Sequence, residues 1–342
     1  MLKLHIDTDL WRAHQRDVVE QCPGSVPVAK GCGYGFGNGV LAGEVERLGL
    51  DTVAVGTAHE VAELRGAGWA GDIVVLNPWR PFDALATQYL ADPHIITTVS
   101  RVEDVQALTR EHPGTAVLVE VETSMHRHGI APDELPRADL SALDVRGWTV
   151  HLPASGSLDE ARALAAAIAR HPQADKGIWL SHLSFDDYRS LAAELDVPLR
   201  MRVGTRLWLG NPKAYRATGT VLDVHQLPKG TPVGYHGEKT PSQGCLVVIS
   251  GGTAHGVALA APATARSFKQ RLIPFAEAFD EFRGQVTSPF TIDGRKRPFA
   301  EPPHMHASLV FVDGPGSPVS VGDEVPVTVR MTTTTFDEVI FE

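Results

Sequence analysis

Between about residues 25 and 205, short apolar runs alternate with amphipathic segments, and this rhythm limits the fold more than any other feature of the chain. Such alternation is typical of parallel strands joined by helices. Segments 59–67 and 158–170 have helical spacing, and the second carries Asp159 and Glu160 near its start, where the helix dipole favours acids. The strand-like runs are 26–29, 52–55, 73–76, 95–99, 116–121, 147–151, 177–180 and 199–203.

Eight strands with about seven intervening helices suit a (β/α)₈ TIM barrel. An open, doubly wound sheet would show the same alternation, so periodicity leaves both architectures open. After about Asn211 the pattern changes to β-rich runs separated by Gly/Pro turns, which indicates an all-β domain. We therefore predict an α/β barrel domain at 1–210 and a β domain at 211–342. The β-rich runs are 217–224, 246–250, 286–292, 307–312 and 325–332.

Composition narrows the class of ligand. The net charge is −10 and the longest basic run is GRKR at 294–297, which argues against nucleic acid and anionic membranes as partners. No stretch of 18 apolar residues occurs, and the charged start MLKLHIDTDLW is unlike a signal peptide. The three cysteines have no ligand-like spacing, so we expect neither a disulfide framework nor a cysteine zinc site. A cytoplasmic protein that binds a small molecule is the expectation.

Lys30 is the first candidate for chemistry. It ends the apolar run VPVAK and is followed by the glycine-rich turn GCGYGFG. A lysine at the end of a barrel strand has a fixed stem and an amine directed at the site, as Schiff-base chemistry requires. From this local context alone, a solvated lysine at a strand–loop junction is an equally good interpretation.

The segment 28–37, VAKGCGYGFG, resembles the cofactor-lysine motif of the alanine racemase family, with Lys30, Tyr34 and Gly35 at the motif positions. Further segments resemble the same family in the same order, and that order is stronger evidence than any one motif. VEVETSMHRHG carries Arg127, VRGWTVHLPAS ends near His151, and MRVGTRLWLG resembles the family's Arg-Pro-Gly segment. The similar segments are 54–76, 119–129, 145–155, 201–210, 227–237, 291–312 and 321–325.

The resemblance implies an N-terminal (β/α)₈ barrel, a C-terminal β domain, and a head-to-tail homodimer whose active sites are shared between subunits. It also implies pyridoxal 5'-phosphate, held as a Schiff base on Lys30 at the mouth of the barrel. Tyr34 and Ser184 would bind the phosphate together with the backbone amides of Gly204 and Thr205, because a glycine turn before a helix exposes N–H groups. In the sequence, the match at SHLS, which contains Ser184, is loose.

Three further residues take roles near the cofactor ring by the same resemblance. Arg127 would lie near the cofactor, and His151 would pack against the pyridine ring. Arg202 would face the ring nitrogen, where a permanent cation keeps that nitrogen unprotonated and favours simple proton exchange. Taken alone, Tyr34 and His151 are equally well explained as hydrogen-bonded core residues.

The chain departs from the family where the second proton-transfer group should be. The family uses a tyrosine from the partner subunit, in Gly-Tyr-Ala-Asp-Gly, but residues 252–256 read GTAHG, with Thr253 at the tyrosine position and His255 at the aspartate position. A threonine hydroxyl is too weak an acid to replace a phenol. The family's Met-Asp-Gln is Met305-His306-Ala307 here, and a lysine that some members carry as a carbamate is Glu120, an anion that can orient Arg127.

Histidines in the β domain are the remaining candidates. His255, His304 and His306 titrate where a second base must, although surface or structural roles explain them equally well. His304 and His306 could also bind a metal, as in the related D-threonine aldolase and D-serine dehydratase group, but no further ligand stands at a recognisable spacing, so we predict no metal.

We therefore predict a pyridoxal-phosphate-dependent amino-acid racemase or epimerase, an isomerase that produces D-amino acids, with Lys30 as one base and His255 or Thr253 near the position of the other. Two alternatives stay open: an enzyme of another class on the same scaffold, such as a decarboxylase, dehydratase or aldolase, and a protein that binds the cofactor without turnover.

Overall fold

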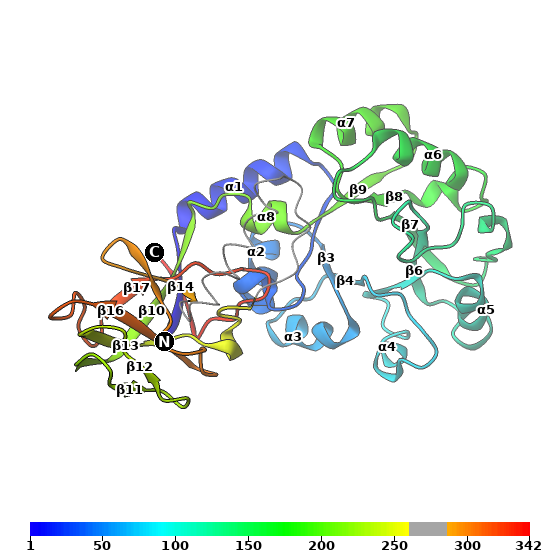
Figure 1. Ribbon diagram of the computed structural model, residues 1–342. Helices are drawn as coiled ribbons and strands as arrows, with labels where there is room; N and C mark the ends of the chain where they lie inside the picture. The colour runs from blue at the N-terminus through cyan, green and yellow to red at the C-terminus, as the bar shows by residue number, and fades with distance from the viewer. Residues whose placement is uncertain (260–285) are drawn as a thin grey trace. The chain divides into compact units, whose positions relative to one another are not determined.

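The chain forms two compact units, and the computed structural model describes residues 1–259 and 286–342. One unit is Arg12–Asn211, and the other combines Met1–Trp11 with Pro212–Glu342 (Figure 1). None of the helices in these described ranges is both long enough and apolar enough to cross a bilayer.

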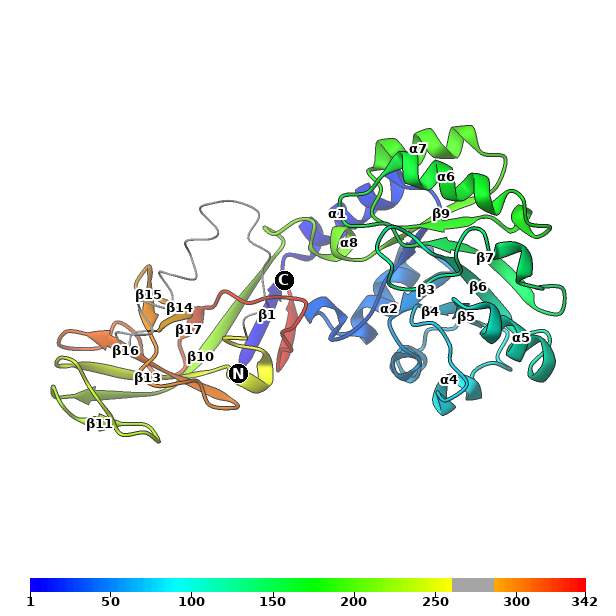
Figure 2. The ribbon, with the colours of Figure 1, turned by 45° about the vertical axis from the view of Figure 1, so that its right-hand side comes forward.

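The first unit is a closed barrel of parallel strands surrounded by helices (Figure 1 and Figure 2). The hydrogen-bonded order is β2-β9-β8-β7-β6-β5-β4-β3, and a parallel bridge between Val28 and Ala54 joins the two ends of that order. The Ala29 N–H donates to the Ala54 carbonyl at 2.8 Å. This closure confirms the predicted barrel and excludes an open sheet. The strands are β2 (Ser25–Pro27), β3 (Thr52–Val55), β4 (Asp72–Val75), β5 (Ile95–Val99), β6 (Ala116–Val121), β7 (Asp144–Val150), β8 (Ile178–Leu180) and β9 (Leu199–Val203).

Some of the helices begin where the sequence supplies a capping side chain. The Ser157 hydroxyl accepts a hydrogen bond from the Glu160 N–H and begins α6, close to the predicted start. The predicted helix 59–67 is a short 3₁₀ turn, η2 (Ala58–Glu60), continued by α3, with Thr57 and Glu60 in a capping box. The helices are α1 (Thr8–Gln21), α2 (Asn38–Arg47), α3 (Val61–Gly66), α4 (Ala84–Gln88), α5 (Val102–Glu111), α6 (Leu158–Ile168), α7 (Phe185–Glu194) and α8 (Thr205–Leu209).

The interior of the barrel is apolar at its lower levels and charged near its mouth. Leu118 belongs to the interior, so the alternation of side chains along β6 directs Glu120 inward at the carboxyl end of that strand. Likewise Arg200, whose guanidinium lies 4.6 Å from the centre of the interior Trp179 ring, is followed by the inward Arg202 on β9. The buried apolar residues of the interior are Val26, Val28, Ala54, Val74, Ile96, Ala116, Leu118 and Trp179.

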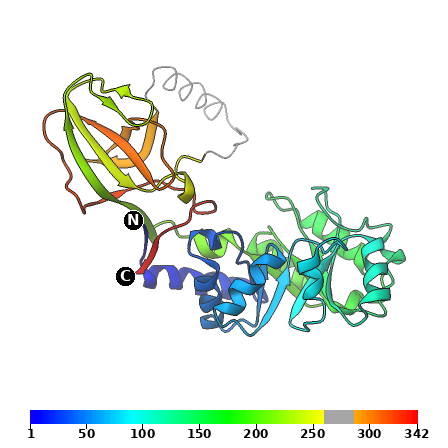
Figure 3. The same cartoon turned by 90° about the horizontal axis from the view of Figure 1, so that it is seen from below.

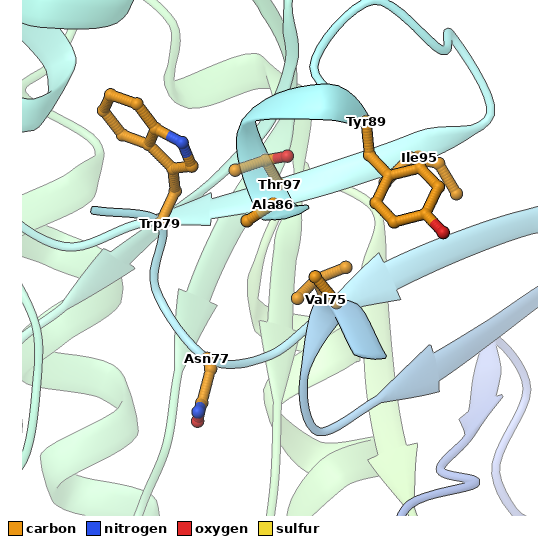
Figure 4. Close-up of a pocket in the computed structure, with 8 residues that line it drawn as sticks. Val75, Asn77, Trp79, Ala86, Tyr89, Ile95 and Thr97 are labelled. Atoms are coloured by element: carbon orange, nitrogen blue, oxygen red, sulfur yellow. The ribbon is translucent and has the colours of Figure 1, made fainter. Parts of the chain in front are cut away.

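A small pocket lies beside the short helix α4 (Figure 4). Ile95 and Thr97, two residues apart on β5, and Val75 on β4 form its floor, while Trp79 and Tyr89 close its sides. Because α4 has five residues, it covers these strands less completely than a full-length helix would. None of the site residues predicted from the sequence lines this pocket.

The second unit is a β structure in which the first strand of the chain takes part. β1, which lies within the segment 1–210 of the sequence-based division, pairs antiparallel with β10 and parallel with β18, so strands near the two ends of the described chain are neighbours (Figure 3). Its sheet runs β16-β13-β10-β1-β18, with β17 also on β10. The strands are β1 (Leu2–Ile6), β10 (Tyr215–Leu227), β11 (Pro232–Val233), β12 (Glu238–Lys239), β13 (Gly244–Ser250), β14 (Thr287–Ile292), β15 (Arg295–Pro298), β16 (Ala307–Asp313), β17 (Glu324–Pro326) and β18 (Glu338–Phe341).

The predicted β-rich runs in this unit correspond to β10, β13, β14, β16 and β17, although β17 is shorter than the predicted 325–332. Their inward residues build one apolar core, to which Leu2 of β1 contributes. Each fully buried aliphatic or aromatic side chain of such a core stabilises the fold by about 1.5–3 kcal/mol relative to an exposed one.

Candidate active site at the mouth of the barrel

Polar side chains gather where the barrel strands end at their carboxyl side. Lys30 follows β2, Glu120 is near the end of β6, His151 follows β7, His182 follows β8, and Arg202 lies near the end of β9. The carboxyl ends of all strands in a parallel barrel open at the same mouth, which is where such barrels carry their sites.

The backbone around Lys30 is held by one carboxylate. Glu60 Oε1 accepts a hydrogen bond from the Gly31 N–H at 2.6 Å, and its Oε2 accepts one from the Gly56 N–H at 2.6 Å. A Cβ at Gly56 would lie 3.3 Å from the Lys30 Cβ and 3.1 Å from Glu60 Oε2, so glycine lets the turns after β2 and β3 approach closely. The stem of Lys30 is therefore fixed at the mouth.

The Lys30 amine lies among cations. Part of the Lys30 side chain is in contact with solvent, but partial burial of its ammonium group lowers the pKa of Lys30. The positive charges of Arg127 and Arg202 lower this pKa further, and the negative charge of Glu60 opposes them. A larger fraction of the amine is then uncharged near neutral pH than in a free lysine. An uncharged amine is the form that attacks an aldehyde.

Tyr34, Gly204 and Thr205 form one cluster. Tyr34 is buried with a positive φ of 54°, and its hydroxyl is hydrogen-bonded to the Thr205 side chain. A Cβ at position 204 would lie 2.1 Å from the Tyr34 oxygen, so only glycine fits there. Burial, assisted by Glu60, raises the pKa of Tyr34 to about 12, which keeps the phenol protonated as a donor. These three members of the predicted phosphate-binding set are together.

Ser184 serves as the N-cap of α7. Its hydroxyl donates to Asp187 Oδ2 at 2.7 Å and accepts from the Asp187 N–H at 3.0 Å. Within the described residues no hydrogen bond connects it with Tyr34, Gly204 or Thr205. The sequence-based assignment of Ser184 to the phosphate group therefore has a competing structural explanation.

His151 is neutral and its tautomer is fixed. Its Nδ1 lies 2.8 Å from Ser181 Oγ and 3.4 Å from Arg202 Nη2. Because an arginine can only donate, Nδ1 is the acceptor and the proton is on Nε2. The pKa of His151 is lowered to about 3, mainly by burial of the ring and further by the positive charges of Arg202 and Arg127.

Arg202 has an unsatisfied donor inside the site. Its side chain is buried, Nη2 donates to the Val150 carbonyl at 3.3 Å, and Nε has no hydrogen-bond partner among the described residues. Burial lowers the pKa of Arg202 to about 10, against the raising effect of Glu120, so it remains a cation at neutral pH. A buried donor without a partner indicates an acceptor supplied from outside the chain.

Glu120 is the anion among these arginines. It is 2% exposed, its Oε1 lies 3.8 Å from Arg127 Nη2, and its Oε2 has no partner in the described part of the chain. Burial raises the pKa of Glu120, while Arg202, Arg127 and Arg80 act to lower it. Glu120 and Arg127, which the sequence suggested as a pair, are neighbours.

His182 is a mouth residue that the sequence analysis missed. Its ring packs edge-on against His151, with 5.1 Å between the ring centres, and its backbone has a positive φ of 64°. The available signal was its place two residues after the predicted strand 177–180, close to the strand end as His151 is at the end of the predicted strand 147–151. The sequence analysis also assigned no role to Ser181, which is hydrogen-bonded to His151.

Thr253 and His255 lie in the second unit, in the short 3₁₀ turn η5 (Thr253–His255). His255 is buried: Nδ1 accepts from the Gly252 N–H at 3.3 Å and Nε2 donates to Asp337 Oδ1 at 3.1 Å. Thr253 is exposed, and its N–H donates to the His304 carbonyl at 2.9 Å. Both ring nitrogens of His255 are thus occupied by structural hydrogen bonds.

The segment that contains His304 and His306 packs beside η5. His304 Nε2 lies 2.5 Å from Glu301 Oε1, and the His306 ring lies edge-on to His255 at 5.8 Å. Across residues 1–259 and 286–342, no group of three or more histidine, cysteine, aspartate or glutamate side chains could hold a metal ion.

Comparison with known proteins places this arrangement in a family. Residues 6–193, more than half of the chain, match the model of the alanine racemase N-terminal domain. Alanine racemase from Nitratidesulfovibrio vulgaris strain Miyazaki F is 29% identical over 255 residues, which are 66% of this chain and 68% of that protein. Alanine racemase from Jannaschia sp. is 26% identical over 279 residues, covering 76% and 78%.

Solved structures show the same fold. An alanine racemase from Clostridium difficile superposes with a TM-score of 0.72 at 16% identity, covering 100% of this chain and 95% of the other. A crystal structure of alanine racemase from Bartonella henselae with covalently bound pyridoxal phosphate gives a TM-score of 0.69 at 18% identity, with 100% and 99% covered. At these identities the structures establish the fold, and the sequence match over residues 6–193 establishes that the chain belongs to the alanine racemase family.

Proposed function

We propose that this chain is a pyridoxal-phosphate-dependent amino-acid racemase in which Lys30 binds the cofactor covalently. The observation that carries the proposal is the buried, unpartnered Arg202 Nε in the same mouth as a lysine whose pKa is lowered. The Bartonella henselae racemase with covalently bound pyridoxal phosphate supports it through the shared fold.

The residues of the mouth fit such a cofactor. Lys30 would bind its aldehyde, Arg202 Nε would donate toward the ring nitrogen, and His151 would lie against the ring. Tyr34 and Thr205 would bind the phosphate with hydroxyl donors, where a side chain at Gly204 would leave no room. When bound, pyridoxal phosphate withdraws electrons from the α-carbon of an amino acid, so that the α-proton can be removed.

The protein groups then decide which protons move. The lowered pKa of Lys30 makes its amine available as a base for the α-proton. Arg202 stays charged at neutral pH and would hold the ring nitrogen of the cofactor unprotonated, which would moderate electron withdrawal and favour return of the proton over cleavage of another bond. His151 stays neutral, so it adds no charge beside the ring.

A one-faced reaction, such as decarboxylation, dehydration or aldol cleavage, is the competing function. It is favoured by one observation: Thr253 stands where the family has its tyrosine, and the nitrogens of His255 are engaged. Incubation with L- and D-alanine, L- and D-serine, and L- and D-glutamate in D₂O separates the two. Racemisation incorporates deuterium with inversion, whereas a one-faced reaction gives exchange with retention or loss of the amino acid.

Covalent cofactor binding is tested by absorption and mass. The wild-type protein, supplied with pyridoxal phosphate, should gain a visible absorption band, and borohydride reduction should fix the cofactor's mass on the peptide that contains Lys30. Lys30→Ala should show neither signal, and its racemase activity should fall by at least about 10⁴-fold, because one residue serves as anchor and base. Lys176→Ala, at an exposed surface lysine, is the matched control. A wild-type protein that stays colourless would contradict the proposal.

We also propose that the chain acts as a homodimer with shared active sites, as the family resemblance implies. Light scattering of the purified protein measures this directly, and mixing two inactive variants altered in different units tests sharing. Recovery of activity in the mixed sample is the expected result.

A further inference from the structure

Racemisation needs two proton-transfer groups, and the mouth of the barrel contains few side chains that can provide the second. His151 is excluded because Nδ1, the ring nitrogen that is free to accept a proton in its tautomer, is already bonded to Ser181. Tyr34 is excluded because its buried hydroxyl is hydrogen-bonded to Thr205 and lies against Gly204, in the group assigned to the phosphate. His126 is paired with Glu122 at 3.1 Å.

His182 differs from these groups because its ring nitrogens are available. No hydrogen bond joins either nitrogen to another of the described residues, and the side chain is exposed at the mouth. The ring nevertheless has a packing partner, because it lies edge-on to His151. An accessible imidazole with a defined position is what a general acid or base requires.

The backbone also holds His182 in an uncommon conformation. Its φ of 64° lies in the left-handed region, which is unfavourable for a residue other than glycine. The turn before α6 packs closely on it: a Cβ at Gly156 would lie 2.3 Å from the His182 carbonyl oxygen. Such strain persists only where the surrounding structure imposes it, and it is common at functional sites.

The strand order places His182 and Lys30 on either side of Arg202. Lys30 follows β2 and His182 follows β8, and β9, which carries Arg202, lies between those two strands. The two side chains thus follow the strands that flank the strand of Arg202, and the charge of Lys30 acts on the pKa of His182, so the amine and the imidazole belong to one neighbourhood. Inversion at a carbon requires two separate proton-transfer groups, one for each face of that carbon, and an amine and an imidazole from different strands are two such groups.

The charges around His182 keep its imidazole neutral. Although one side of the ring is exposed, its partial desolvation by the surrounding protein lowers the pKa of His182, and the charges of Arg202, Lys30, Arg206 and Arg127 lower it further. The groups come from β9, the turn after β2, α8 and the loop after β6, with the neutral His151 from the end of β7. A neutral imidazole can accept a proton at physiological pH.

We propose that His182 is the second proton-transfer group of the racemase. The inference rests on the proposed function and takes it one residue further. In one direction, an imidazole nitrogen of His182 accepts the α-proton while the Lys30 ammonium delivers a proton to the opposite face of the same carbon. In the reverse direction both transfers run backwards. After each turnover His182 releases its proton to solvent and Lys30 takes one up, so the starting protonation states are restored and no co-reactant is consumed.

The first test compares racemisation with exchange in D₂O. His182→Gln should lower racemisation of the active amino acid by about 10²- to 10⁴-fold while one-faced exchange by Lys30 continues. His182→Gly is the second variant, because glycine tolerates the positive φ and folds without strain, and free imidazole should restore its racemisation. His126→Gln, at another exposed histidine with positive φ, is the matched control.

The second test needs no cofactor or turnover. Histidine NMR signals of the cofactor-free protein should include one that disappears in His182→Gly and titrates below the ordinary value of 6.5. Lys30→Met should raise the pKa of that imidazole by removing a nearby cation, whereas Lys176→Met should leave it unchanged. An unchanged pKa in Lys30→Met would overturn the proposed juxtaposition.

The outcomes separate this inference from the function on which it depends. If His182→Gln and His182→Gly racemised the amino acid as fast as the wild type, the proposed role of His182 would be wrong, but the proposed racemase function would be unaffected. Absence of α-proton exchange in the wild type would overturn the racemase, and the role of His182 with it.

Discussion

The mouth of the barrel and the η5 turn of the β unit both carry histidines beside buried charged or polar groups, but they differ in how completely those groups are paired. At η5, His255 uses both ring nitrogens within the protein, and Glu301 pairs with His304. At the mouth, Arg202 Nε and Glu120 Oε2 are buried and have no hydrogen-bond partner in residues 1–259 and 286–342, and the ring nitrogens of His182 have none there either. Buried polar groups that are satisfied stabilise a fold, whereas unsatisfied ones indicate a place for a ligand.

Replacement of Glu120 gives the largest effect expected from this comparison. Glu120→Gln leaves the buried Arg202 without its nearby anion, so we expect the protein to lose about 3–5 kcal/mol of stability. Glu134→Gln breaks a surface pair with Arg137 and should cost less than about 1 kcal/mol. Denaturant unfolding measures both. Equal losses would mean that the mouth is no more strained than the surface.

Substitutions in the η5 turn should lower the free energy of unfolding and should leave cofactor binding unchanged. His255→Leu removes the hydrogen bonds to Gly252 and Asp337 and should destabilise the protein by about 1–3 kcal/mol. His306→Leu, at an exposed neighbour, should change stability by less than about 0.5 kcal/mol. Thermal unfolding and the cofactor spectrum provide the readouts. If His255→Leu kept full stability but lost racemisation, the assignment of this turn as structural would be wrong.

The protonation of Lys30 provides a further test, in which the expected effect is a shift of a pH profile. Arg127 lowers the pKa of Lys30, so Arg127→Met should raise that pKa and shift the pH dependence of cofactor capture to higher pH. The rate at which the visible band forms, measured across pH, reports the shift. Arg137→Met, at an exposed arginine, should leave the profile in place.

Stability in acid gives a last test, which has no effect at neutral pH. His151 is neutral in the folded protein down to about pH 3, whereas an unfolded histidine takes up a proton below about 6.5. Its contribution to stability is therefore complete above pH 6.5 and is lost as the pH falls toward 3. His151→Gln should flatten the fall in urea midpoint over this interval. An unchanged slope would contradict a buried neutral imidazole.

The individual elements of the barrel could be predicted well from the sequence, because buried parallel strands read as apolar runs and helices begin at local caps. Lys30, Tyr34 and Gly204 could also be proposed as site residues from the sequence, since each lies in a short motif. His182 was not, because its position depends on contact with His151 from another strand. The occupied nitrogens of His255 depend on Asp337, which lies far away in the sequence.

By itself, the sequence determined the eight parallel strands, the change to β structure after about Asn211, and the lysine that marks the family. The tertiary structure decided that the sheet closes, through the bridge from Val28 to Ala54, and that β1 joins the β unit by pairing with β10 and β18. The physical reason is the separation along the sequence of the residues that interact. Hydrophobic periodicity and capping act between residues a few positions apart, whereas sheet closure, ring contacts and the partners of buried charges depend on residues that meet only in the folded chain.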